Sequence, residues 1–256
     1  MRDLQSEPDN RNIPIDKVGV KNLRYPICLS DKFHKKQHTI ANINMYVNLP
    51  HNFRGTHMSR FIEILNRFHR EIAIQNIGNI LRTMKQELNA ESAHLEMAFP
   101  YFILKKAPVS GEVGLMEYQC RFLGDLTDKV KIVLEVCVPI TTLCPCSKAL
   151  STKSAHNQRG VIKVQVRFRG FLWIEDLIEL IENCGSSPVY SLLKREDEKY
   201  VTEHAYENPV FVEDVVRNVA LKLENCPQII WYKIETESYE SIHNHDAYAS
   251  LEKKLK

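Results

Sequence analysis

The hydrophobic pattern of the chain switches between two periods in a fixed order, and that order constrains the fold more than any other feature. Apolar residues alternate with polar ones over 38–49, recur at helical spacing over 58–68 and 77–88, and alternate again over 94–101. A period of two is typical of a strand with one buried face, and a period of about 3.6 is typical of an amphipathic helix. The pattern predicts a strand, two helices and a return to strands, with Pro100 indicating an edge position or a bulge.

The second half of the chain repeats this order. Its predicted elements are strands over 115–123, 130–138 and 162–168, helices over 174–181 and 212–223, and a closing strand over 230–236. We therefore expect an α+β fold of two tandem units, each an antiparallel sheet with two helices on one face. The predicted divisions are a loosely ordered arm over 1–30, a first unit over 31–125 and a second unit over 126–256.

Composition limits the partners of this fold. The 256 residues are 44% hydrophobic, enough for a substantial core, and their formal net charge is only +2. Such a chain lacks the strongly positive surface potential that binds a nucleic-acid backbone. No run of apolar residues approaches the roughly 18 that a membrane-spanning helix needs. Its cysteines are odd in number, seven, and most are scattered singly. We expect a cytoplasmic protein with reduced thiols and with no nucleic-acid or membrane partner.

Cys144 and Cys146 flank a proline just after a predicted strand, with Lys148 close behind. A thiolate is a soft metal ligand and a nucleophile, and a nearby lysine favours the charged form. Cys-x-Cys alone is a weaker metal signal than Cys-x-x-Cys, so two incidental loop cysteines remain an alternative. His156, twelve positions after Cys144, is by itself compatible with a ligand or with a surface histidine.

Three further segments carry titratable side chains. His243 and His245 follow the closing strand, where extended backbone points both rings the same way and suits proton transfer, a surface cluster being the alternative. Glu213, at the start of the last predicted helix, either complements the helix dipole or accepts the adjacent N–H and amino donors of a guanine edge. The charged run over 194–203 by itself is typical of a solvated loop. No Gly-rich phosphate loop is present.

Several of these strings together resemble the type IB GTP cyclohydrolases. The resemblance spans about 35–249, and the segments that carry it are 54–61, 144–148, 154–160, 200–209, 211–214 and 240–246. It implies the tunnelling fold, with two such units per chain assembled as a barrel-like homotetramer whose active sites lie at subunit interfaces.

The resemblance also implies roles, residue by residue. Cys144, His156 and Glu198 look like the ligands of one divalent ion, Zn²⁺ or else Mn²⁺ or Fe²⁺, with a water completing an open site. Glu213 resembles the guanine anchor. The residues similar to the family's catalytic positions are the proton-transfer pair His243 and His245, Glu240 beside them, and Cys146 near the metal.

The implied reaction is the first step of folate and pterin biosynthesis. A metal-bound hydroxide attacks C8 of GTP once N7 is protonated, C8 leaves as formate, and rearrangement gives 7,8-dihydroneopterin triphosphate. Without a phosphate loop, the triphosphate needs side-chain cations. Candidates are Arg54, His57, Arg60, Lys148, Lys153, Arg159, Lys194 and Arg195.

Three alternatives stay open. An archaeal-type relative resembles the same motifs and yields a cyclic phosphate. A related tunnelling-fold reductase acts on a deazapurine nitrile with NADPH, and it would need Cys144 or Cys146 as nucleophile and no His-x-His pair. A non-catalytic purine- or metal-binding module would have no use for proton-transfer histidines.

Overall fold

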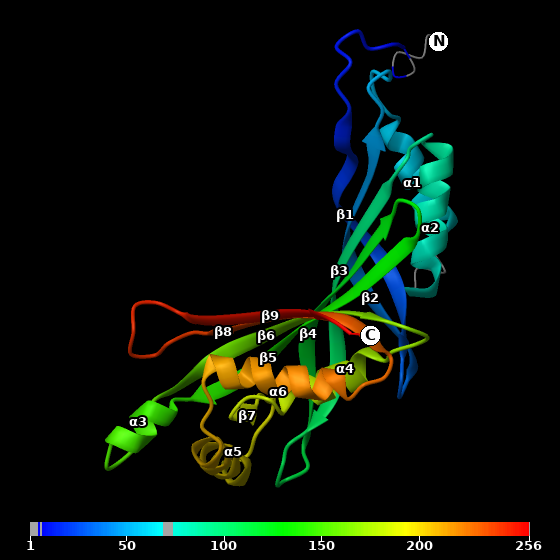
Figure 1. Ribbon diagram of the computed structural model, residues 1–256. Helices are drawn as coiled ribbons and strands as arrows, with labels where there is room; N and C mark the ends of the chain where they lie inside the picture. The colour runs from blue at the N-terminus through cyan, green and yellow to red at the C-terminus, as the bar shows by residue number, and fades with distance from the viewer. Residues whose placement is uncertain (1–4, 6, 69–73, 256) are drawn as a thin grey trace. The chain divides into compact units, whose positions relative to one another are not determined.

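The computed structural model describes residues 5, 7–68 and 74–255 of the chain. Its strands are β1 (Ile15–Asp31), β2 (Lys35–Leu49), β3 (Ala93–Lys106), β4 (Val113–Leu126), β5 (Val130–Leu143), β6 (Asn157–Phe168), β7 (Ser187–Pro188), β8 (Ile229–Ser238) and β9 (Ala247–Lys254). Its helices are α1 (Met58–Arg67), α2 (Ile74–Glu87), α3 (Pro145–Leu150), α4 (Ile174–Glu182), α5 (Arg195–Glu207) and α6 (Val212–Glu224). Strands and helices thus form the α+β fold that the hydrophobic pattern predicts (Figure 1).

The strands pair in the order β1-β2-β3-β4-β5-β6-β8-β9, and β7 pairs with β5. The chain divides into two compact units: unit 1 is Met1–Pro100 with Arg121–Leu134, and unit 2 is Tyr101–Cys120 with Glu135–Lys256. Strands β3, β4 and β5 each contribute residues to both units. A single boundary near residue 125 therefore does not describe the division, because antiparallel strands carry the chain out of a unit and back again.

Unit 1 packs α1 and α2 against its strands (Figure 1). Phe61 and Ile64 of α1 and Ile77 and Leu81 of α2 are fully buried, as the helical spacing predicts. At Gly124 in β4, an added Cβ would lie 2.7 Å from the side chain of Ile77. Only glycine lets α2 approach the strand this closely.

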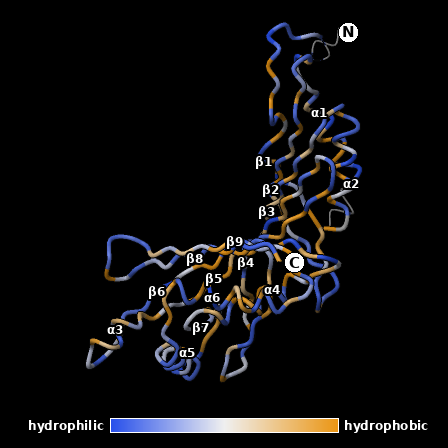
Figure 2. The backbone as a smooth tube through the Cα atoms, viewed as in Figure 1, coloured by the Kyte–Doolittle hydropathy of each residue, from blue (hydrophilic) through white to orange (hydrophobic). Residues whose placement is uncertain are grey.

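Unit 2 packs α6 against β8 and β9, and α4 against α6. The residues of β6 alternate as predicted: Ile162, Val164 and Val166 are buried, and Lys163 and Gln165 between them are half-exposed. Apolar stretches along the strands contrast with the largely hydrophilic connection between β8 and β9 (Figure 2). No helix among the described residues combines the length and apolarity needed to cross a bilayer.

The sequence prediction lacks β1, α5 and β9, and also the short elements α3 and β7. The expected arm contains β1, which pairs antiparallel with β2 from Ile15 to Asp31; residues 1–4 and 6 of that arm lie outside the described part. Register shifts in β1 break its alternation, so the sequence shows no strand period there. The charged run over 194–203 is helical in α5, which buries only Asp197 and Ala205 and so lacks an apolar face. The short strand β9 was also not predicted.

Candidate active site

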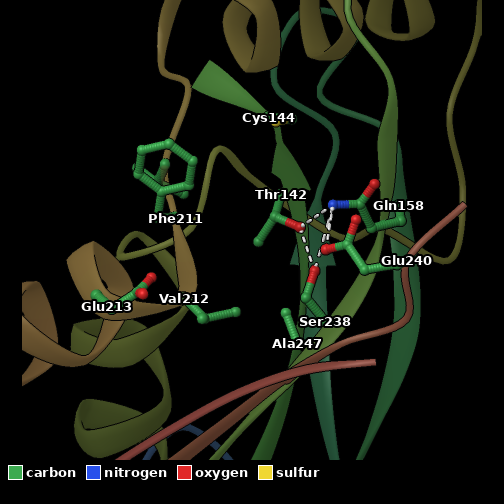
Figure 3. A pocket seen from close by; sticks show the side chains of 10 residues that line it. Thr142, Cys144, Gln158, Phe211, Val212, Glu213, Ser238, Glu240 and Ala247 are labelled. Atoms are coloured by element: carbon green, nitrogen blue, oxygen red, sulfur yellow. Dashed lines mark hydrogen bonds between the residues drawn. The ribbon is translucent and has the colours of Figure 1, made fainter. Parts of the chain in front are cut away.

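A cavity of about 210 Å³ opens in unit 2 where β5, β6 and β8 meet the start of α6. Its lining residues are Thr142, Cys144, Gln158, Val210, Phe211, Val212, Glu213, Ser238, Glu240 and Ala247. Figure 3 shows Thr142, Gln158, Ser238 and Glu240 on one side and Phe211 and Glu213 on the other. The cavity therefore has a polar wall of strand residues and a second wall from the first turn of a helix.

The polar wall is organised around the side-chain amide of Gln158. Its Nε2 lies 3.1 Å from Thr142 Oγ1, 3.4 Å from Ser238 Oγ and 3.3 Å from Glu240 Oε1. The two hydroxyls are themselves hydrogen-bonded at 2.7 Å, and both residues are buried. Strands β5, β6 and β8 each supply one member of this network, so their side chains hold the end of the sheet in one arrangement.

Cys144 and His156 lie side by side at the same end of the sheet. The Cys144 N–H donates to the His156 carbonyl at 3.1 Å. Cys144 is the N-cap of α3, and its Sγ accepts from the Ser147 N–H at 3.4 Å. The Ser147 hydroxyl in turn accepts from the His156 N–H at 3.2 Å. The turn that begins α3 thus holds Cys144 and His156 as neighbours through their backbones.

The imidazole of His156 has one nitrogen engaged. Its Nδ1 lies 3.0 Å from Gln158 Oε1. An amide oxygen only accepts, so Nδ1 is the donor, and in the neutral ring Nε2 then keeps its lone pair. A thiol beside an imidazole with an unprotonated nitrogen is a donor pair that fits Zn²⁺ or another divalent transition metal.

The opposite wall is the start of α6. The Val210 N–H donates to the Leu143 carbonyl at 3.1 Å, which places this segment beside the residue that precedes Cys144. The Phe211 N–H donates to Asp214 Oδ2 at 3.1 Å and caps the helix. Glu213 is exposed and lines the cavity. Its carboxylate therefore faces a space bounded on the other side by Glu240.

Helix α5 is anchored through the buried carboxylate of Asp197. This carboxylate accepts from the N–H groups of Val109 at 2.8 Å, Ser110 at 2.9 Å and Lys194 at 2.8 Å, and from the Ser110 hydroxyl at 2.6 Å. Burial alone would favour the neutral acid, but these hydrogen bonds hold the pKa of Asp197 well below its usual range. The next residue, Glu198, is exposed on the first turn of α5.

The other end of α5 contacts α3. Lys148 Nζ donates to the Tyr206 carbonyl and lies 4.4 Å from the centre of the Tyr206 ring. Lys148, a predicted triphosphate cation, therefore ties the helix that follows Cys144 to the helix that carries Glu198.

His243 and His245 lie in the connection between β8 and β9. Both are exposed, and their rings stack at 5.2 Å between centroids. The His243 ring lies 6.5 Å from that of His156, edge to face. The rings of His243 and His245 thus stack on each other, although residues 241–245 form bends rather than the extended backbone that the sequence predicts, and the His243 ring lies near that of His156.

The structure brings together some of the predicted site residues. Cys144, Glu213 and Glu240 line the cavity, and His156 and His243 adjoin it through the contacts above. Within the described residues of a single chain, no three His, Cys, Asp or Glu side chains gather into a metal-binding group. Glu198 and Cys146, both exposed, are not among the lining residues.

The predicted triphosphate cations are divided between the units. Arg54 and Arg60 belong to unit 1, as does His57, and the arginines are engaged: Arg54 Nη1 pairs with Glu7 Oε2 at 3.2 Å, and Arg60 Nη1 donates to the Glu87 carbonyl at 3.1 Å. The cations of unit 2 that are exposed are Lys153, Arg159, Lys194 and Arg195.

Sequence reasoning assigned no role to Thr142, Gln158 or Ser238. The signal that could have found Gln158 is the period of two: His156 and Gln158 are half-buried, while Asn157 and Arg159 are exposed. A polar residue on the same strand face as a candidate ligand is placed to contact it. Thr142 and Ser238 carry no such signal, because the pairing of distant strands brings them to Gln158.

Comparison with known proteins gives a consistent family. A family model described as type I GTP cyclohydrolase folE2 matches residues 1–249. Proteins named GTP cyclohydrolase FolE2 from Syntrophotalea carbinolica and Pelobacter propionicus are 61% and 60% identical to this chain over 252 residues. Both matches cover 98% of this chain, with 95% and 98% of those proteins.

Solved structures show the same fold at much lower sequence identity. Uricase from Arthrobacter globiformis superposes with a TM-score of 0.52 at 7% identity, covering 94% of this chain and 93% of that chain. A uricase from Bacillus fastidious gives 0.56 at 6%, covering 93% and 92%. This likeness supports the tunnelling fold for the arrangement of strands and helices described above.

Proposed function

This chain belongs to the type I GTP cyclohydrolase folE2 family, and we propose that it converts GTP and one net water to 7,8-dihydroneopterin triphosphate and formate. The observation that carries the proposal is the cavity itself: a carboxylate at its helical wall faces a polar strand wall, with a thiol and an imidazole at one end. This reaction is the first step of folate and pterin biosynthesis.

Glu213 is the residue that binds the base in this proposal. A guanine ring presents N1–H and the 2-amino group side by side, and an ionised carboxylate accepts from both. Glutamine in its place would offer one acceptor and one competing donor. The exposure of Glu213 in the single chain leaves its carboxylate open to such a ligand.

Cys144, His156 and Glu198 are the proposed ligands of one divalent ion. The backbone contact between Cys144 and His156 supports the first two, and the third rests on the family to which the chain belongs. When bound, the ion supplies a water whose pKa is lowered toward neutrality. The thiolate, imidazole and carboxylate donors accommodate Zn²⁺, Mn²⁺ or Fe²⁺.

Proton transfer falls to the stacked pair His243 and His245. The proposed role is delivery of a proton to N7 of the purine, with one ring holding the proton while the other acts as base. Glu240, which begins the same connection, accepts from Gln158 and lines the cavity beside them. Cys146, exposed on α3, assists near the metal.

A homotetramer with active sites between subunits fits the distribution of these residues. Glu198, His243 and His245 are all exposed in the single chain, and so are Arg159 and Arg195. A neighbouring subunit that covers them would exclude water and bring further cations, such as its own His57 and Arg60, to the triphosphate. We place the enzyme in the cytoplasm, where its free cysteines stay reduced.

The test is incubation of the purified protein with GTP, followed by formate measurement and product mass. We expect formate and 7,8-dihydroneopterin triphosphate in equal amounts without NADPH. A product lighter by the loss of diphosphate would indicate the cyclic phosphate of the archaeal-type reaction, and a requirement for NADPH with a nitrile substrate would indicate the reductase. Release of no formate by metal-loaded protein contradicts the proposal.

Glu213→Gln sharpens the assignment of the substrate. Loss of a charge-assisted pair of hydrogen bonds should raise KM for GTP about 10-fold to 100-fold. Glu207→Gln, an exposed carboxylate at the end of α5, is the matched control and should leave KM unchanged. An unaltered KM in Glu213→Gln would remove it as the guanine anchor.

A further inference from the structure

Gln158 connects two parts of the site that the proposed function treats separately. Its amide oxygen faces the imidazole of His156, with Oε1 and Nδ1 3.0 Å apart. Its amide nitrogen faces Glu240, with Nε2 and Oε1 3.3 Å apart. One planar group therefore lies between a proposed metal ligand and a carboxylate that lines the cavity.

The orientation of this amide follows from its neighbours. An ionised Glu240 only accepts hydrogen bonds, so the amide must present its N–H groups on that side. Thr142 and Ser238 accept from the same nitrogen, at 3.1 Å and 3.4 Å. The reverse orientation would place two acceptor oxygens, those of Gln158 and Glu240, against each other.

The orientation of the amide decides the tautomer of the imidazole. With Oε1 toward the ring, Nδ1 carries the proton, and Nε2 has the lone pair that a metal ligand needs. The Ser241 hydroxyl also donates to Oε1, at 3.4 Å. Both ends of the amide are thus held by residues of the segment that follows β8.

We propose that Gln158 is a positioning residue that fixes His156 in the tautomer with an unprotonated Nε2, and that Glu240 sets this tautomer through the orientation of the Gln158 amide. The proposal rests on the metal site proposed above. It gives Glu240 a role in metal binding without direct contact with the ion.

The first experiment compares the Zn²⁺ affinities of three variants by competition with a chromogenic chelator. Gln158→Met keeps the length of the side chain and removes the acceptor, so Zn²⁺ affinity should fall about 10-fold to 100-fold. The double variant Gln158→Glu with Glu240→Gln keeps an acceptor toward Nδ1 and restores a donor between positions 158 and 240, so it should retain most of the affinity. Gln165→Met makes the same change on the same strand, where Gln165 donates to Glu135 instead of accepting from a histidine, and it should bind Zn²⁺ as the unmodified protein does.

The second experiment reads the tautomer directly, in metal-free protein, by ¹⁵N NMR of the histidine rings. The His156 signal is assigned by its loss in His156→Ala. We expect the Nδ1–H form in the unmodified chain, a shift toward Nε2–H in Gln158→Met, and both forms in Glu240→Gln, because a neutral amide at 240 no longer dictates the orientation of Gln158.

Wild-type Zn²⁺ affinity together with an unchanged tautomer in Gln158→Met would overturn the inference. Weaker binding that occurs equally in Gln165→Met would also overturn it, since the cause would then be a general loss of stability. Failure of the metal site itself is distinguishable: in that case Cys144→Ala and His156→Ala would also bind Zn²⁺ normally.

Discussion

His156 and the pair His243 and His245 are held in opposite ways, although the rings of His156 and His243 lie only 6.5 Å apart. His156 precedes β6 and has hydrogen bonds to its N–H, its carbonyl and its Nδ1. His243 and His245 are exposed in a hydrophilic connection, where their rings contact each other. The fold thus fixes one imidazole and leaves two at the surface.

The difference matches the chemistry proposed for each. A metal ligand must present a lone pair in one direction. The hydrogen bonds to the backbone and ring of His156 hold its imidazole in one orientation. A proton-transfer residue must change its protonation state and follow the substrate, which an exposed connection permits.

Replacing Cys144 or His156, which hydrogen bonds hold in place, should abolish metal binding. Cys144→Ala or His156→Ala removes one donor of the proposed set, so bound metal should fall from about one ion per chain to a small fraction, with formate release lost in parallel. Metal analysis of the purified variants measures this. Cys226→Ala, which removes a half-buried thiol outside the cavity lining, is the control, and full metal content in either ligand variant would contradict the assignment.

Replacing His243 or His245 should slow the reaction and leave the metal bound. His243→Gln or His245→Gln should reduce formate release about 100-fold to 10,000-fold, the usual contribution of a general acid or base. Metal content should stay as in the unmodified protein, because neither histidine is a proposed metal ligand. His38→Gln, an exposed histidine of β2, is the control. Unchanged turnover would remove the pair from the mechanism, and loss of metal would remove the contrast with His156.

The smallest expected effect is on thermal stability. It involves Glu235 of β8, whose carboxylate is hydrogen-bonded by neighbouring side chains near the start of the connection between β8 and β9. The hydrogen bond and ion pair with Lys163, at 2.9 Å, together with hydrogen bonds from Tyr248 and Lys233, lower the pKa of Glu235 from 4.5 to about 2. Because the folded pKa is lowered, the ionised carboxylate stabilises the fold above about pH 4.5. This contribution is lost as the pH falls toward 2.

Glu235→Gln should therefore lower Tm at neutral pH by about 2 to 4 °C, and the difference from the unmodified chain should close as the pH falls to about 2. Thermal unfolding across this pH range measures it. In Glu252→Gln the amide oxygen can still accept from the Trp231 indole N–H, so its Tm difference should not follow this pH dependence. A difference for Glu235→Gln that is constant with pH would show that the carboxylate contributes through packing.

The sequence could predict those elements that bury a regular apolar face. The strands near β2, β3 and β6 and the helices α1, α2, α4 and α6 all occur where periodicity places them, because burial repeats with the geometry of the element. It could not predict β1, α5 or β9. These are held by backbone pairing, or in α5 by the buried carboxylate of Asp197, and such contacts leave no hydrophobic period.

The sequence by itself determined the α+β class, the family and the chemical identity of the candidate groups, because period, motif and donor type are local properties of the chain. Only the tertiary structure decided that Thr142, Ser238 and Glu240 meet at Gln158, and that Gln158 faces His156. Thr142, Gln158 and Ser238 come from three strands, and Thr142 and Ser238 are 96 positions apart in the chain. The pairing of β6 with β8 and the packing of α6, rather than any spacing in the sequence, bring them together.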